Sequence, residues 1–162
     1  MAKYLKLLMV ALFATLTFTI TSCGDDDEPS AGNLIEINGK KWAVKNDALV
    51  PMGYWFESLN YGLAFWVVNT PDDNGQSYMF ACGDCAYPKK GDDFAKIGEL
   101  TVELTNSSKN VVYSYESGSA KILATDQNNE KMTIQYDNLK MTNGGSSYTF
   151  NGTITIPWNF EK

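Results

Sequence analysis

A Cys-x-x-Cys pair is the strongest candidate for side-chain chemistry in this chain. Cys82 and Cys85 enclose Gly83 and Asp84, and such a pair can form a disulfide, exchange with other disulfides or bind a metal. A disulfide suits a tight turn containing glycine, and the chain-entropy estimate for so short a loop is roughly 2 kcal/mol. We predict a structural disulfide here.

The two other thiol chemistries fit the surroundings of the pair less well. A redox-active pair places its first cysteine at a helix N-terminus, where the helix dipole lowers the thiol pKa. Here a predicted strand precedes Cys82, and Ala86-Tyr87-Pro88 follows Cys85. Zinc would need two further ligands, so we predict no metal site. A secreted thiol-disulfide enzyme using Cys82 and Cys85 remains a third hypothesis for function.

Two absent residue types exclude several classes of enzyme. The chain has no histidine and no arginine. Ser-His and Cys-His nucleophile pairs are therefore impossible, and there is no imidazole for zinc or haem. Without arginine the chain lacks the bidentate group for phosphate, and its net charge of −6 disfavours nucleic acid as a partner. We expect no catalytic residues and no cofactor.

Acidic turns do not change that expectation. Residues 72–75 (Asp-Asp-Asn-Gly) and 91–93 (Gly-Asp-Asp) carry oxygen ligands, but neither completes a twelve-residue calcium loop with its closing glutamate. A glycosidase would need one carboxylic acid with a raised pKa in a cleft, and a small β-domain gives little room for such a cleft. A hydrolase is therefore less favoured than a binding module.

Aromatic residues are concentrated between positions 42 and 66. Their density suits a sugar-stacking surface or an apolar pocket, although aromatic side chains of β-proteins more often lie in the core. Three neighbours, Tyr54-Trp55-Phe56, cannot all face inward on one strand. We predict that Trp55 and Trp66 are the exposed, ligand-facing residues, with Tyr54 and Tyr61 beside them.

Alternation of apolar and polar residues predicts the elements that carry these groups. It is clearest at residues 100–105, 131–137 and 148–156. Turns rich in Asn, Asp and Gly separate the predicted strands. Asn38-Gly39 between two apolar runs predicts a hairpin. The fold class is all-β, an antiparallel meander of about eight to ten strands that forms a barrel or a two-sheet sandwich.

Three segments depart from simple alternation. Residues 83–98 form the longest irregular stretch, with room for a short helix in 89–97. Residues 111–116 and 120–125 are expected as separate strands. Residues 61–68 are apolar on both faces, which indicates a strand that is covered on both sides or exposes Trp66 to a ligand.

The N-terminal region has the pattern of an export signal. Lys3 and Lys6 precede an uncharged apolar run over residues 7–20, which is short for a transmembrane helix and typical of a signal peptide. Thr21 and Ser22 then precede Cys23, and this resembles the lipobox of bacterial lipoproteins. The resemblance implies cleavage before Cys23 and palmitate-type acyl chains on Cys23 that hold the domain on the bilayer.

An acidic cluster, Asp25-Asp26-Asp27-Glu28, follows Cys23. Like charges repel one another, so we expect a solvated tether. A cysteine followed by such a cluster resembles the export signal of surface-exposed lipoproteins in Bacteroidetes, which implies an outer-membrane lipoprotein facing outward. The predicted domains are a signal peptide (1–22), the lipidated cysteine and tether (23–33) and a β-domain (34–162).

The β-domain itself has a looser resemblance. Residues 35–42 (Ile-Glu-Ile-Asn-Gly-Lys-Lys-Trp) and 148–156 (Tyr-Thr-Phe-Asn-Gly-Thr-Ile-Thr-Ile) look like segments of uncharacterised Bacteroidetes lipoproteins with one small β-domain, some of them lipocalin-like. Lipocalins carry Gly-x-Trp at the first strand, whereas this chain has Gly39-Lys40-Lys41-Trp42. The resemblance implies a lipocalin-like barrel at most.

Two main hypotheses for function follow. The first is a non-enzymatic, surface-anchored binding module for a glycan or a protein partner. The alternative is a lipocalin-like carrier of a small apolar ligand, which requires an interior cavity.

Overall fold

The computed structural model describes residues 33–44, 53–58, 61–69, 77–106 and 109–160. The predicted signal peptide, Cys23 and nearly all of the tether lie outside these residues, as does the acidic turn 72–75. Among the described residues, no helix combines the length and the apolar character needed to cross a membrane.

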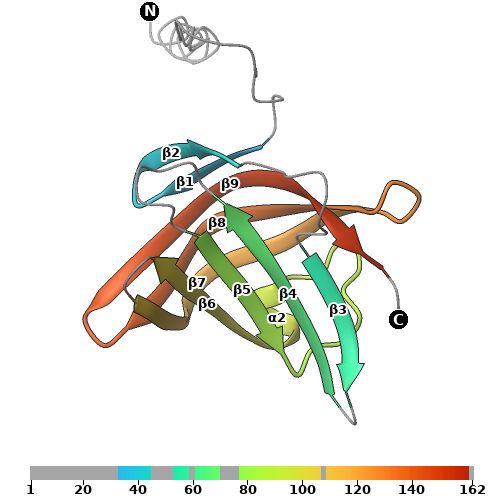
Figure 1. The fold of residues 1–162 in the computed structure, drawn as a ribbon, viewed down its shortest axis with the longest axis horizontal. Coiled ribbons are helices and arrows are strands. Elements are labelled where there is room, and N and C mark those ends of the chain that lie inside the picture. The colour runs from blue at the N-terminus through green and yellow to red at the C-terminus, as the bar shows by residue number, and fades with distance from the viewer. Residues whose placement is uncertain (1–32, 45–52, 59–60, 70–76, 107–108, 161–162) are drawn as a thin grey trace, which may run out of the picture.

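The described residues form nine strands and one short helix (Figure 1). The elements, in chain order, are β1 (Leu34–Ile37), β2 (Lys40–Ala43), β3 (Gly53–Ser58), β4 (Tyr61–Asn69), β5 (Ser77–Gly83), α2 (Phe94–Ile97), β6 (Glu99–Asn106), β7 (Lys109–Asp126), β8 (Lys131–Asn143) and β9 (Ser146–Asn159).

Seven strands, β3 to β9, close into a barrel. Each pairs antiparallel with the next, and β9 returns to β3 through a parallel contact at Gly53 and Tyr54. The parallel closure follows from the odd number of strands, because the first and seventh strands of an up-and-down meander run in the same direction. The predicted all-β meander is confirmed, and the barrel is the correct one of its two forms.

The hairpin of β1 and β2 lies outside this ring. β1 pairs with β9 at residues 150–153, so the edge of β9 that does not face β8 is shared between β1 and β3. The predicted Asn-Gly turn is confirmed, since Asn38 and Gly39 have φ angles of 50° and 81°. Two positive φ angles are the requirement of a type I′ hairpin turn.

The strand predicted in two pieces, 111–116 and 120–125, is one long strand, β7. Its register with β8 shifts around Ser117, where Gly118 has a φ of 88°. β8 shifts its own register against β9 between Tyr136 and Leu139, beside Gly118. Adjacent bulges bend both strands sharply, and the barrel wall turns here without interrupting either strand.

Aromatic side chains fill the interior of the barrel. Trp66 on β4 stacks on Phe80 of β5 at 5.2 Å between ring centroids and lies 4.3 Å from the ring of Phe94. Tyr136 and Phe150 approach Phe80 from the opposite wall, at 5.4 and 5.2 Å. Most of these rings are fully buried. Side chains, not open space, therefore occupy the centre of the described barrel.

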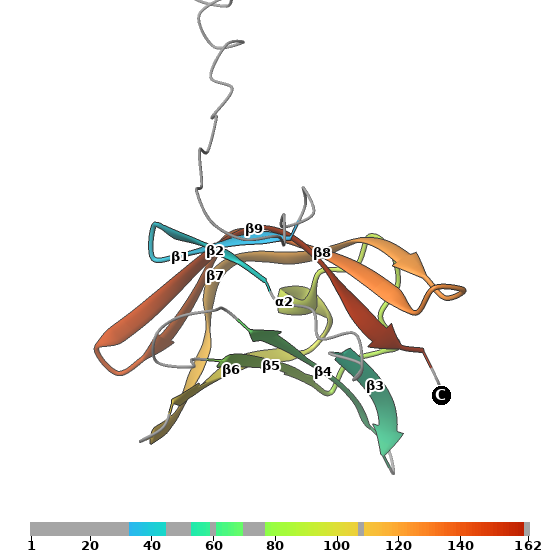
Figure 2. The same cartoon turned by 45° about the horizontal axis from the view of Figure 1, so that its top comes forward.

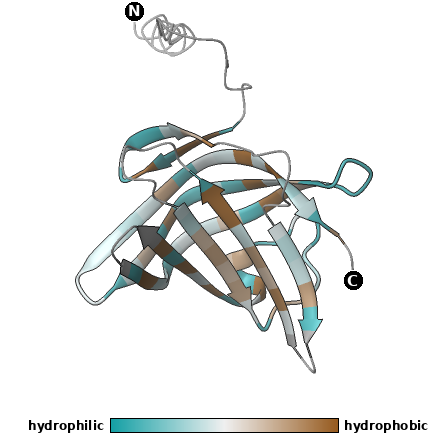
Figure 3. Cartoon of the chain, in the orientation of Figure 1, coloured by the Kyte–Doolittle hydropathy of each residue, from teal (hydrophilic) through white to brown (hydrophobic). Residues whose placement is uncertain are grey.

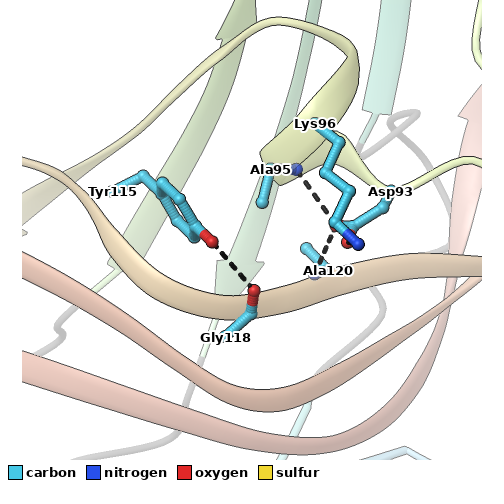
Figure 4. A network of polar contacts seen from close by, with 6 residues as sticks. All are labelled: Asp93, Ala95, Lys96, Tyr115, Gly118 and Ala120. Atoms are coloured by element: carbon cyan, nitrogen blue, oxygen red, sulfur yellow. Dashed lines mark hydrogen bonds and ion pairs between the residues drawn. The ribbon is translucent and has the colours of Figure 1, made fainter.

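Helix α2 lies between the two walls of the barrel (Figure 2). It falls within the segment 89–97 for which a short helix was predicted. Asp93 caps it, because the carboxylate Oδ1 accepts hydrogen bonds from Ala95 N (3.1 Å) and from Ala120 N of β7 (2.9 Å). Figure 4 shows Asp93 joining the helix to β7, with Lys96 at 3.6 Å from Oδ2.

We predict that Asp93→Ala destabilises the fold by about 2–3 kcal/mol, because it removes a helix cap and leaves the buried Ala120 N–H without an acceptor. Urea denaturation followed by fluorescence measures the change. Lys96→Ala is the control, since Lys96 is 73% exposed and its ion pair contributes less than about 1 kcal/mol. Equal losses in the two variants would contradict this role of Asp93.

Candidate functional site

Strand β4 is apolar on both faces, as its sequence indicates, and the structure assigns each face. Ala64, Trp66 and Val68 point into the barrel and are fully buried. Leu63, Phe65 and Val67 alternate with them on the outside of the barrel and are only half-buried. Successive side chains of a strand point to opposite faces, so the inward set determines the outward one.

The prediction that Trp55 and Trp66 are exposed is wrong. Trp66 is 0% exposed, and its Nε1 donates a 2.8 Å hydrogen bond to the hydroxyl of Tyr136 inside the barrel. Trp55 is 8% exposed and packs edge-on against Tyr87, with its Nε1 3.5 Å from the carbonyl oxygen of Cys85. Both indoles fill core volume and bond buried acceptors, which explains their inward direction.

The aromatic side chains that do lie outside come from the same strands. Tyr54, Phe56 and Phe65 form a cluster on the outer surface, in which Tyr54 stacks on Phe65 at 5.2 Å and Phe56 meets Phe65 edge-on at 6.2 Å. Phe56 is 42% exposed. Tyr54 is thus the predicted site residue that lies on this surface, while the side chain of Tyr61 is outside the described part of the chain.

Apolar neighbours extend the cluster across three strands. We call the whole patch the outer aromatic face. It consists of Tyr54, Phe56, Leu63, Phe65, Val67 and Met79. Figure 3 shows hydrophobic residues side by side on β4 and β5 in the front wall. Scattered exposed apolar residues are normal, whereas adjacent ones on neighbouring strands make this patch the candidate for an interaction surface.

Small residues leave one side of this patch open. Phe65 pairs across to Ala81 and Leu63 pairs to Gly83, so no large side chain of β5 stands beside either of them. Beyond β5, Thr101 and Glu103 of β6 supply a polar border. The arrangement offers aromatic and aliphatic area next to hydrogen-bonding groups.

Sequence reasoning missed Phe56 and Phe65. The available signal was the two-residue period itself, since Tyr54 and Phe56 share one face of β3 while Trp55 takes the other. What the period does not give is which face is inside. The prediction places the larger indoles of Trp55 and Trp66 against a ligand, whereas in the structure they fill the barrel core.

The Cys82–Cys85 pair lies under the end of this wall. In the structure both cysteines are free thiols and both are buried. The Cys82 thiol donates toward Phe94 O at 3.4 Å, and the Cys85 thiol donates toward Cys82 O at 3.1 Å. Among the described residues, no three Cys, Asp or Glu side chains are grouped closely enough to hold a metal ion.

A shallow groove lies on the opposite wall. It has a volume of about 340 Å³ and runs between the β1–β2 hairpin and β9. Leu34, Glu36, Lys41 and Asn151 are among its lining residues. The groove contains one carboxylate and one amine but no aromatic ring, so it lacks the stacking area of the outer aromatic face.

No family model matches this chain, and no curated protein or solved structure is similar enough to count as a match.

We predict that truncating two neighbouring aromatic residues destabilises the fold to very different extents. Trp55→Ala removes a buried indole and should cost about 3–5 kcal/mol of unfolding free energy. Phe56→Ala trims a side chain on the surface and should cost less than about 1 kcal/mol. Chemical denaturation of both variants measures the difference. A larger loss for Phe56→Ala would mean that the outer aromatic face is part of the structural core.

Proposed function

We propose that this protein is a surface-anchored lipoprotein whose barrel acts as a non-enzymatic binding module, and that the outer aromatic face binds a glycan. The observation that supports the proposal most is the cluster of Tyr54, Phe56 and Phe65 on the outside of a barrel whose interior is already filled. Ring faces stack against the C–H face of a sugar, and polar side chains at the border bind its hydroxyl groups.

The anchor is proposed from the sequence, and the arrangement of the strands supports an outward role. β1, the first described strand, lies in the upper wall of the barrel in Figure 2, while β3, β4 and β5 lie in the lower wall. In a chain held by acyl chains on Cys23, β1 is the described strand nearest to the anchor in the sequence. The outer aromatic face lies on the wall opposite to β1, which supports a binding role directed away from the anchor.

The alternatives have weaker support. A carrier of a small apolar ligand needs interior space, and the rings of Trp66, Phe80 and Phe94 occupy the barrel centre. A thiol-disulfide enzyme needs an accessible nucleophile, and Cys85 is 3% exposed. A protein partner would use the same outer surface as a glycan. The binding experiments below distinguish these two hypotheses.

The proposed anchor predicts a change of fraction on mutation. Cys23→Ala should move the protein from the membrane fraction to the soluble fraction and abolish incorporation of labelled palmitate, because the acyl chains supply the membrane affinity. Immunoblotting of both fractions measures it. Cys82→Ala is the matched control and should stay membrane-bound. Retention of Cys23→Ala on the membrane would argue against lipid anchoring.

The proposed glycan site predicts a loss of affinity on truncation. Once a glycan array identifies a ligand, Phe56→Ala and Phe65→Ala should each weaken binding by about tenfold or more in calorimetry, since aromatic anchors carry much of an interface's energy. Leu123→Ala is the control, because Leu123 is 38% exposed on β7, away from the patch.

Two outcomes would count against a glycan. If Leu123→Ala weakened glycan binding equally, the binding site would not be the outer aromatic face. Absence of any glycan binding, together with a protein captured on the cell surface in a manner sensitive to Phe56→Ala, would identify a protein partner.

A further inference from the structure

The turn that contains Cys82 and Cys85 is tightly packed. A Cβ atom placed on Gly98 would lie 2.8 Å from both the Cys82 sulfur and the Cys85 Cβ, so these two atoms flank the same point. Interaction between the two neighbouring thiols lowers the pKa of Cys85 to about 7 and raises the pKa of Cys82. Glycine at position 98 permits this close approach.

The same turn holds the β3–β4 hairpin. The Cys85 amide donates to the carbonyl of Gly62 at 3.1 Å, and the Cys85 carbonyl accepts from Trp55 Nε1 at 3.5 Å. Any side chain on Gly62 would collide with the Cys85 carbonyl and the Trp55 ring. Cys85 thus contacts both strands of the hairpin through its backbone.

The hairpin depends on this contact because β3 is weakly held elsewhere. Its register with β9 covers only Gly53 and Tyr54, and in the described part of the chain the remainder of β3 pairs with β4 alone. Trp55 lies between Tyr54 and Phe56 in the sequence. Its anchorage at Cys85 therefore sets where two rings of the outer aromatic face stand.

We propose that Cys82 and Cys85 are joined by thiol–disulfide exchange with a protein disulfide donor, and that the resulting bond locks the β3–β4 hairpin and the outer aromatic face it carries. The lock is a property of the fold and can be tested without a ligand. Only its effect on affinity rests on the proposed function.

The exchange balances in two steps. The Cys85 thiolate attacks one sulfur of the donor disulfide, a mixed disulfide forms, and the donor's other sulfur leaves as a thiolate. Cys82 then loses its proton, and its sulfur attacks the Cys85 sulfur, which releases the second donor sulfur. Two electrons pass from the protein to the donor, so one disulfide forms and one is reduced.

The burial of both thiols gives this pair a structural role. An incoming disulfide cannot reach Cys85 while the turn is packed, so exchange requires opening of the segment around Asp84, which is exposed and has a φ of 54°. Once the bond forms and the turn closes, a reductant meets the same barrier. We therefore expect the disulfide to form once, during folding, and to persist, without repeated cycles of oxidation and reduction.

Hydrogen exchange of the oxidised and the reduced protein tests the lock. The oxidised form is made with oxidised glutathione, and mass spectrometry should find it two hydrogen masses lighter and resistant to alkylation. After reduction, amides of the β3–β4 hairpin, including those near Trp55 and Gly62, should exchange roughly tenfold faster or more. Amides of β8 around Ile134 should be unchanged.

A double variant separates the bond from the reagents. Cys82→Ser with Cys85→Ser should show hairpin exchange that does not respond to reductant. The proposal fails if both cysteines remain alkylatable after oxidation. It also fails if reduction accelerates exchange equally in the hairpin and in β8, because that would be a global effect. Neither outcome depends on glycan binding.

Discussion

The packing of Trp66 inside the barrel is the interaction on which the rest of the structure depends. Its indole touches Phe80 from the neighbouring strand and Phe94 from α2, and its N–H reaches Tyr136 across the interior. These partners come from β5, the helix and β8, so one side chain joins both walls and the helix between them. Because Trp66 must point inward, Phe65 must point outward.

This alternation of inward and outward side chains determines how much of the site could be predicted from the sequence. Alternation gave the strands, their turns and the two-faced character of residues 61–68, because a period of two is a local property of the chain. It could not say which face closes around the core, since that depends on pairing with distant strands. Trp55 and Trp66 were therefore placed outside, one residue out of phase with Phe56 and Phe65.

Bulges limited the prediction of element lengths in a similar way. Residues 116–119 contain a glycine and interrupt the alternation, which resembles a loop in sequence. In the structure, the positive φ of Gly118 and the paired bulge of β8 absorb the irregularity within continuous strands. A bulge is a property of two adjacent strands, so a single segment cannot distinguish it from a turn.

The barrel combines a fixed frame with one weakly held element. β7, β8 and β9 share long antiparallel registers, while β3 has β4 along one side and only two paired residues toward β9. Because β3 has the fewest paired residues of the described barrel strands, the rings that it carries would be poorly fixed by strand pairing alone. The turn at Cys85 compensates by bonding to Gly62 and Trp55 from below. The turn at Cys85 thus connects the well-paired strands to the outer aromatic face and fixes the position of its rings.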